Sequence, residues 1–163
     1  MLEDSGDMPQ LETKCFGTTE YEPDSVFRFP SGLPGFEAEK EFVFLERPQT
    51  DPLLFLQSIS NPGLCFITLP ILAADPRYRL QLTPEDRADL ELPPEGDLVI
   101  GKDILCAAIV CAADESHPQP TANLRAPIVV NLPRRIGLQA VQLQCDYSYQ
   151  HPLLAREDVT SCS

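Results

Sequence analysis

Short runs in which apolar and polar residues alternate recur along this chain, and their period of two predicts β-strands. The first clear run, at 25–29, places Phe27 and Phe29 on one face and Arg28 on the other. Similar runs predict further strands at 42–46, 53–59, 64–69, 77–82 and 128–130. The pattern therefore favours a mainly β fold.

Two of these runs are joined by a strong turn signal. Asn-Pro-Gly at 61–63 predicts a tight turn, so that 53–59 and 64–69 form a hairpin. A longer apolar stretch, 97–113, is interrupted at 101–103. Its second part is apolar on both faces, which predicts a strand in the centre of the core.

The last run begins at Gly137 and predicts a strand whose Val141 and Leu143 share one face. Cys106 and Cys111 lie five positions apart, so on one strand they would point to opposite faces. They therefore cannot share a metal ion, and no C-x-x-C pair occurs among the six cysteines. We expect free thiols and neither a metal nor a cofactor.

One stretch carries a strong helix start. Thr83 is a good N-cap residue, Pro84 suits the first helical position, and Glu85 and Asp86 favour the positive end of the helix dipole. The helix should end near Leu90, before a Pro-Pro pair.

These elements add up to eight or nine short strands and one short helix. The 17 prolines require short elements with many stiff turns. We expect a small antiparallel β-barrel-like domain, because a closed sheet exposes no strand edges. We expect the domain to span 11–154, with a flexible N-terminal extension at 1–10 and a flexible C-terminal tail at 155–163.

A net charge of −13 makes direct binding of nucleic acid unfavourable, because phosphates repel the chain. The charge suits a basic protein partner, but solubility alone also explains it. Acids concentrate at 1–24 and 85–97, whereas 116–145 holds none and carries three arginines. If these segments fold onto different faces, the molecule is electrostatically two-sided; if they interleave, the charges cancel.

The N-terminal residues do not resemble a secretion signal, and no apolar run approaches the ~20 residues of a membrane helix. We therefore expect a cytoplasmic protein without membrane contact. We also favour a monomer, although the sequence leaves the oligomeric state open. His117 and His151 lack a nucleophile motif, and the glycines form no phosphate-binding loop. We expect no enzyme, but the many carboxylates leave a small β-barrel enzyme or ligand carrier open as the alternative.

Pro34 and Gly35 fit the central positions of a type II turn, with Gly35 at positive φ. Such a turn fixes Leu33 and Phe36 relative to each other at low entropic cost. The apolar pair either plugs one end of a barrel or forms a docking surface for another protein.

The turn also belongs to a series of motifs. "FPSGLPGFE" at 29–37, followed by "FVFLE" and "FLQSISNPGLCFI", resembles the first half of the FliW family of flagellar assembly factors. "TANLRAPIVVN" at 121–131 resembles a later signature of that family, and "GLQAVQL" and "DYSYQHPL" resemble its C-terminal motifs. The order and spacing match from about 11 to 154.

The resemblance implies a small β-barrel-like protein without catalysis. Members of the family bind CsrA, a basic RNA-binding translational regulator, and so relieve its repression of flagellin mRNA. They also bind flagellin, and the export of flagellin frees them for CsrA. The candidate partner-binding residues come from the Pro-Gly turn, the acidic stretch and the 121–131 signature: Leu33, Pro34, Gly35, Phe36, Glu85, Asp86, Asp89, Glu91, Asn123 and Leu124.

Overall fold

The structure, a computed structural model, describes residues 9–14, 16–116, 118–143 and 145–153. The expected tail and most of the expected extension lie outside these residues, although Gln10 begins the first strand. The strands are β1 (Gln10–Thr13), β2 (Gly17–Glu20), β3 (Val26–Arg28), β4 (Glu41–Leu45), β5 (Leu54–Ser58), β6 (Cys65–Pro70), β7 (Ile104–Cys111), β8 (Thr121–Ala122), β9 (Ile128–Asn131), β10 (Ile136–Gln139) and β11 (His151–Pro152). The α-helices are α1 (Ile71–Ala74) and α2 (Pro84–Asp89).

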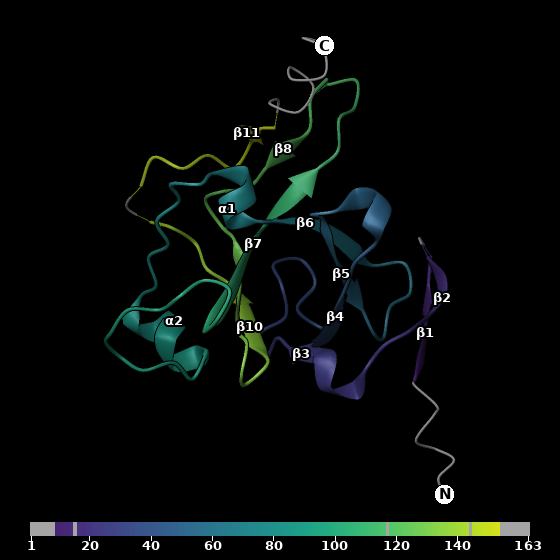
Figure 1. The fold of residues 1–163 in the computed structure, drawn as a ribbon, viewed down its shortest axis with the longest axis horizontal. Helices are drawn as coiled ribbons and strands as arrows, with labels where there is room; N and C mark the ends of the chain where they lie inside the picture. Colours follow the sequence, from purple (N-terminus) through teal and green to yellow (C-terminus); the bar gives the residue numbers. More distant parts are fainter. Residues whose placement is uncertain (1–8, 15, 117, 144, 154–163) are drawn as a thin grey trace, which may run out of the picture.

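The predicted β-barrel is confirmed. Strands β7, β6, β5, β4, β3, β10 and β9 pair in that order, and a further pairing of β7 with β9 closes the sheet (Figure 1). All but one of the pairings are antiparallel; the exception is a short parallel contact between β10 and β3, at Ile136 and Arg28. Beyond the barrel, β7 continues into pairings with β8, which in turn pairs with β11.

The barrel interior is filled by apolar side chains from alternate strand positions. Phe27, Phe29 and Phe42 pack there with Leu56 and Val130, and all five are buried. The rings of Phe29 and Phe42 meet edge to face, with centroids 5.3 Å apart. The alternation at 25–29 therefore predicted the inward face of β3 correctly.

On one side, the outward face of the barrel is covered by the β1–β2 hairpin, which we call the N-terminal hairpin (residues 10–20). Val43 and Leu45 of β4 point outward and pack against Leu11. Phe16 meets Phe55 edge to face at 4.9 Å. Strand β4 is thus apolar on both faces because both of its faces are covered.

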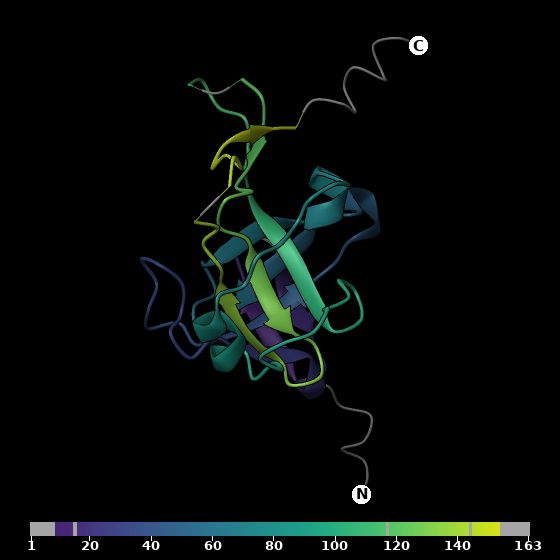
Figure 2. The ribbon, with the colours of Figure 1, turned by 90° about the vertical axis from the view of Figure 1, so that its left-hand side faces the viewer.

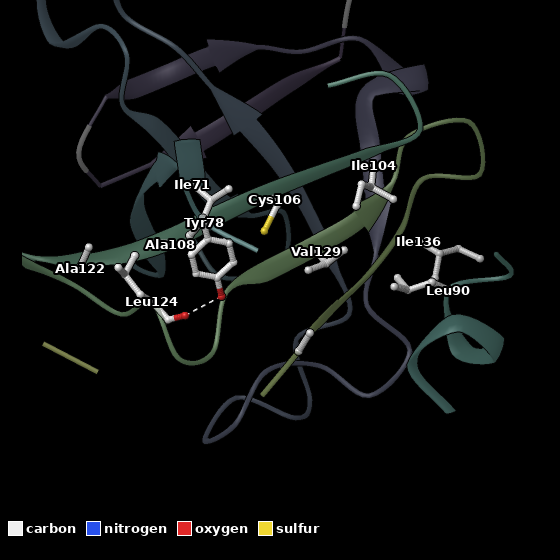
Figure 3. Packing of buried hydrophobic residues seen from close by; sticks show 11 residues of the cluster. Ile71, Tyr78, Leu90, Ile104, Cys106, Ala108, Ala122, Leu124, Val129 and Ile136 are labelled. Atoms are coloured by element: carbon white, nitrogen blue, oxygen red, sulfur yellow. Dashed lines mark hydrogen bonds between the residues drawn. The ribbon is translucent and has the colours of Figure 1, made fainter. Parts of the chain in front are cut away.

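On the opposite side of the barrel lies what we call the α2 segment (residues 71–100), which contains both α-helices (Figures 1 and 2). It covers the outward face of β7, β9 and β10. Its Ile71, Tyr78 and Leu90 pack against Ile104 and Cys106 of β7 (Figure 3). The predicted central position of this apolar stretch is confirmed for residues 104–110, since β7 pairs with β6, β8 and β9, but residues 111–113 are exposed.

The predicted strand at 77–82 is wrong: no strand forms there. The alternation itself is real, because Tyr78 is buried while Arg79 and Gln81 are exposed. What is missing is a neighbouring strand: the N–H groups of Arg79 and Gln81 donate to side chains instead. The prediction of a single helix is also incomplete, since the four-residue α1 precedes this stretch.

The last predicted strand is too long at its C-terminal end, but its alternation holds: Val141 and Leu143 are exposed, whereas Ala140 and Gln142 are buried. Strand β10 ends at Gln139, and the exposed fractions of Val141 and Leu143 are 43% and 67%. The thiols behave as their spacing requires, because Cys106 is buried and Cys111, at the other end of β7, is exposed. No helix among the described residues is long and apolar enough to span a membrane.

Candidate functional site

Helix α2 forms where its sequence predicts it and presents acidic side chains outward. Thr83 and Asp86 form a capping box: the Asp86 N–H donates to Thr83 Oγ1 (3.0 Å), and the Thr83 N–H donates to Asp86 Oδ2 (3.3 Å). Leu90, fully buried, fixes the C-terminal end of the helix to the barrel. Glu85 and Asp89 remain exposed, so their charges are available to a partner.

The chain after α2 is held by side-chain bonds. Arg87 donates to the carbonyls of Pro93 (2.8 Å) and Gly96 (3.0 Å). Asn131 at the end of β9 donates from Nδ2 to the Leu90 carbonyl (2.7 Å). These bonds fix the loop that carries the remaining acids of the stretch.

Glu91 differs from the other predicted acids. It adopts a left-handed backbone conformation with φ of 57°, and its carboxylate lies 3.3 Å from the Arg134 guanidinium. Both side chains are about half exposed or more, so the pair contributes little stability. The acidic stretch and the arginine-bearing segment therefore meet at this point, and the two predicted charge blocks interleave here.

The Pro-Gly turn forms as predicted. Gly35 has a φ of 85°, and the Phe36 N–H donates to the Leu33 carbonyl (2.7 Å). Leu33 is 2% exposed and packs with the barrel interior, so it acts as a plug and not as a docking side chain in this conformation. Phe36 is 40% exposed, and its ring meets that of Phe66 edge to face, with centroids 5.5 Å apart. The violet-blue loop that carries the turn projects at the left of Figure 2.

The third predicted location is a backbone turn. Asn123 Oδ1 accepts from the N–H groups of Arg125 (3.1 Å) and Ala126 (3.0 Å), which is the role of an Asx turn. Leu124 is 1% exposed, and its carbonyl accepts from the Tyr78 hydroxyl at 2.6 Å (Figure 3). The Leu124 side chain is therefore part of the core and is not available to a partner here.

The predicted residues do not converge on one site. Leu33 belongs to the barrel interior, whereas Leu124 packs in the outer cluster that also contains Leu90 at the end of α2. Two separate surfaces remain available to a partner: the acidic side chains around α2, and Phe36 on its projecting loop.

Sequence reasoning missed a further apolar surface. Leu143 and Tyr149 are 67% and 56% exposed, and Arg125 lies between them: its guanidinium is 5.7 Å from the Tyr149 ring centroid and donates to the Leu143 carbonyl (3.5 Å). The sequence did carry a signal for the Arg125 part of this surface, because three arginines stand in a segment without acids. The strand predicted for this run placed Val141 and Leu143 on one face but did not indicate that this face is exposed.

Two hollows adjoin the loop after α2. One, of about 300 Å³, lies between Glu91, Leu98 and Arg134. The other, of about 420 Å³, lies between the stretch before α2 and residues 96–100. Both lie outside the barrel, on the side covered by the α2 segment.

Burial and hydrogen bonding alter the pKa values of several groups. Burial raises the pKa of the Cys106 thiol to about 12, and burial also raises the pKa of the Tyr78 hydroxyl well above its usual value. Hydrogen bonds from Ser60 and Ser58 lower the pKa of Glu39. Among the described residues, no group of three or more His, Cys, Asp or Glu side chains is placed to hold a metal ion.

Comparison with known proteins gives a consistent result. The family model described as FliW protein matches residues 10–153. The chain is 33% identical over 146 residues to a flagellar assembly factor FliW of Desulfitobacterium hafniense (strain Y51), covering 90% of this chain and 91% of the relative. It is 30% identical over 144 residues to that of Syntrophomonas wolfei, covering 88% of each chain.

A solved structure supports the same assignment. The crystal structure of the flagellar assembly factor FliW superposes with a TM-score of 0.75 at 30% identity, covering 88% of this chain and 96% of that chain. The barrel, the sequence motifs and both comparisons agree. This chain is a member of the FliW family of flagellar assembly factors.

Proposed function

We propose that this protein binds CsrA and antagonises its repression of flagellin mRNA, and that it binds flagellin as a chaperone-like partner. It acts in the cytoplasm as a monomer, through protein contacts, without catalysis and without direct contact to RNA. Membership of the FliW family over residues 10–153 carries this proposal.

The interior of the barrel supports a role without a bound substrate. Small barrels that carry ligands hold them in a cavity enclosed by the sheet. Here Phe29, Phe42 and Leu56 occupy that space and are fully buried. Both hollows described above lie outside the barrel, so contacts with other molecules are expected at its surface.

A gel-shift titration tests the antagonist function. CsrA is bound to flagellin leader RNA, and the protein is added in increasing amounts. Release of the RNA, without any band of this protein bound to the RNA, is the expected result. If CsrA stays fully bound to RNA at saturating protein, the antagonist function is excluded.

Charge reversal tests where the basic partner binds. The double variant Glu85→Lys and Asp89→Lys should weaken the complex with CsrA by about tenfold at low ionic strength, and less at high salt. The matched control, Glu20→Lys with Asp24→Lys, makes the same change in exposed residues on the side of the N-terminal hairpin. Equal effects of both variants would assign the attraction to overall charge.

Exposed apolar side chains support the chaperone-like function. Phe36 offers an aromatic surface on a stiff turn, which suits an apolar segment of unassembled flagellin. Phe36→Ser should weaken flagellin binding by about tenfold, as expected for an aromatic anchor. Leu72→Ser, at a side chain of similar exposure on α1, is the control. Unchanged binding by Phe36→Ser would place the flagellin contact elsewhere.

A pull-down with both partners tests how the two functions are linked. If flagellin and CsrA bind competitively, so that the protein acts as a switch between them, added flagellin should displace CsrA from the immobilised protein. A stable ternary complex would contradict the switch and indicate independent sites.

A further inference from the structure

One backbone edge of the stretch before α2 is already bonded. The Gln81 N–H donates to Gln142 Oε1 (2.8 Å), and its carbonyl accepts from Gln142 Nε2 (3.0 Å). The Arg79 N–H donates to the Tyr147 hydroxyl (2.8 Å). This edge is therefore closed by the side chains of Gln142 and Tyr147.

The other edge is open. Successive residues of an extended chain direct their backbone groups to opposite sides. The N–H groups of Leu80 and Leu82 and the carbonyl of Leu80 must then point away from Gln142. Within the described part of the chain these three groups have no hydrogen-bond partner. They are arranged like the free edge of a β-strand.

The open edge borders the hollow of about 420 Å³. Residues 96–100 form the opposite wall, where the N–H groups of Leu98 and Ile100 likewise lack a partner among the described residues. The half-buried side chains of Leu80 and Leu82 belong to the outer apolar cluster beneath it. The hollow is therefore a groove with backbone donors on both walls and an apolar floor.

The charge around the groove is net negative. Residues 77–97 hold six carboxylates against three arginines. Arg87 is engaged with the carbonyls of Pro93 and Gly96, whereas Glu85 and Asp89 of α2 are exposed. Arg79, at the other end of the groove, is the exposed cation on its wall. A segment with basic residues at the α2 end complements this pattern.

We propose that the groove binds an extended segment of the basic partner by strand addition. Its backbone pairs with Leu80 and Leu82, its alternate apolar side chains pack on the floor, and its Lys or Arg residues approach Glu85 and Asp89. This inference rests on the proposed function and assigns CsrA, not flagellin, to the groove.

Hydrogen exchange of single amides tests the pairing directly. In the free protein the N–H groups of Leu80 and Leu82 should exchange rapidly, because they have no partner among the described residues. Saturating CsrA should slow both by more than tenfold, while the amide of Gln81, bonded in both states, changes little. Protection confined to other parts of the protein would overturn the inference.

A matched pair of variants tests the same contact by affinity. Leu80→Pro and Leu80→Ala both remove the leucine side chain, but only proline also removes the N–H. Because that N–H bonds to none of the residues that the structure describes, the two variants should have similar unfolding midpoints. Leu80→Pro should bind CsrA about tenfold more weakly than Leu80→Ala. Equal affinities would contradict strand addition.

The outcomes separate the inference from the proposed function. If CsrA binds and the amides of Leu80 and Leu82 stay unprotected, strand addition fails and the antagonist function stands. If flagellin protects these amides and CsrA does not, the assignment of the occupant is wrong. If CsrA does not bind at all, both fail. Should Leu80→Pro not fold, the exchange experiment on the unmodified protein decides alone.

Discussion

The N-terminal hairpin and the α2 segment cover opposite sides of one barrel, and they do so in different ways. The hairpin pairs its own strands over a continuous register from Gln10 with Glu20 to Thr13 with Gly17. The α2 segment has no strand partner between Tyr78 and Leu82, and its backbone is fixed by side chains from other elements. Both bury outward-facing apolar side chains of the barrel.

The difference shows that the burial of apolar side chains and the pairing of backbone hydrogen-bonding groups are separate conditions. The hairpin meets the first condition through Leu11, and it meets the second along the inner edges of β1 and β2, which pair with each other. The α2 segment meets the first condition through Leu90 and Tyr78, but leaves backbone donors open beside a groove. A stable core beneath an unpaired edge is what strand addition requires. The following predictions test this contrast, from the largest expected effect to the smallest.

Leu90→Ala should have the largest effect. The side chain is fully buried and attaches α2 to the barrel, so its truncation should lower the free energy of unfolding by about 2–5 kcal/mol. Urea unfolding measures this loss. Hydrogen exchange should increase in the α2 segment and not in the hairpin. Leu72→Ala, at an exposed position of α1, is the control; comparable losses would contradict the role of Leu90 as the anchor.

Tyr78→Phe should have an intermediate effect. It removes the hydroxyl that donates to the buried Leu124 carbonyl, with almost no change in shape. An unpaired buried carbonyl costs about 1–3 kcal/mol, to be measured by urea unfolding. Tyr149→Phe removes an exposed hydroxyl and should cost little. If the two variants match, the Tyr78 bond does not stabilise the α2 segment.

Thr83→Ala should cost less, about 1 kcal/mol, because it removes one half of the capping box of α2. The matched change Thr18→Ala, on the hairpin, breaks only an exposed contact with Glu12 and should cost less still. Thermal unfolding of both variants measures the difference. A larger loss of stability from Thr18→Ala would contradict the expectation that the cap of α2 contributes more than the Thr18 contact in the N-terminal hairpin.

The two thiols of β7 should differ in reactivity without any effect on the fold. Burial raises the pKa of Cys106 to about 12, so this thiol stays protonated and unreactive at pH 8, whereas Cys111 is exposed. An alkylating reagent should modify Cys111 and leave Cys106 unmodified until the protein unfolds; peptide mass spectrometry identifies the product. Rapid modification of Cys106 in the folded protein would contradict its burial.

The same thiol also predicts a dependence on pH. The unfolded thiol ionises near pH 9, but the folded one does so only near 12. The unfolded state therefore gains stability between these values, and the contribution of Cys106 to folding is present below pH 9 and lost as the pH rises. Cys106→Ala should reduce the fall in stability above pH 9.

The sequence predicted those features whose cause is local. The alternation of Phe27 and Phe29 with Arg28 identified an inward face, and Thr83 with Asp86 identified a capped helix. The sequence-based predictions failed where a segment distant in the chain decides which structure forms. The stretch at 77–82 alternates like a strand but lacks a neighbour to pair with, and Leu143 lies beyond the point where β10 ends.

The sequence alone determined the short strands, the helix cap, the negative charge and the motif series that identified the family, because each depends on neighbouring residues or on composition. Only the tertiary structure decided that Leu33 and Leu124 are buried, that Glu91 meets Arg134, and that Leu80 has an open edge. The physical reason is that exposure and hydrogen-bond pairing depend on which segments, distant in the chain, are brought together by the closing of the barrel.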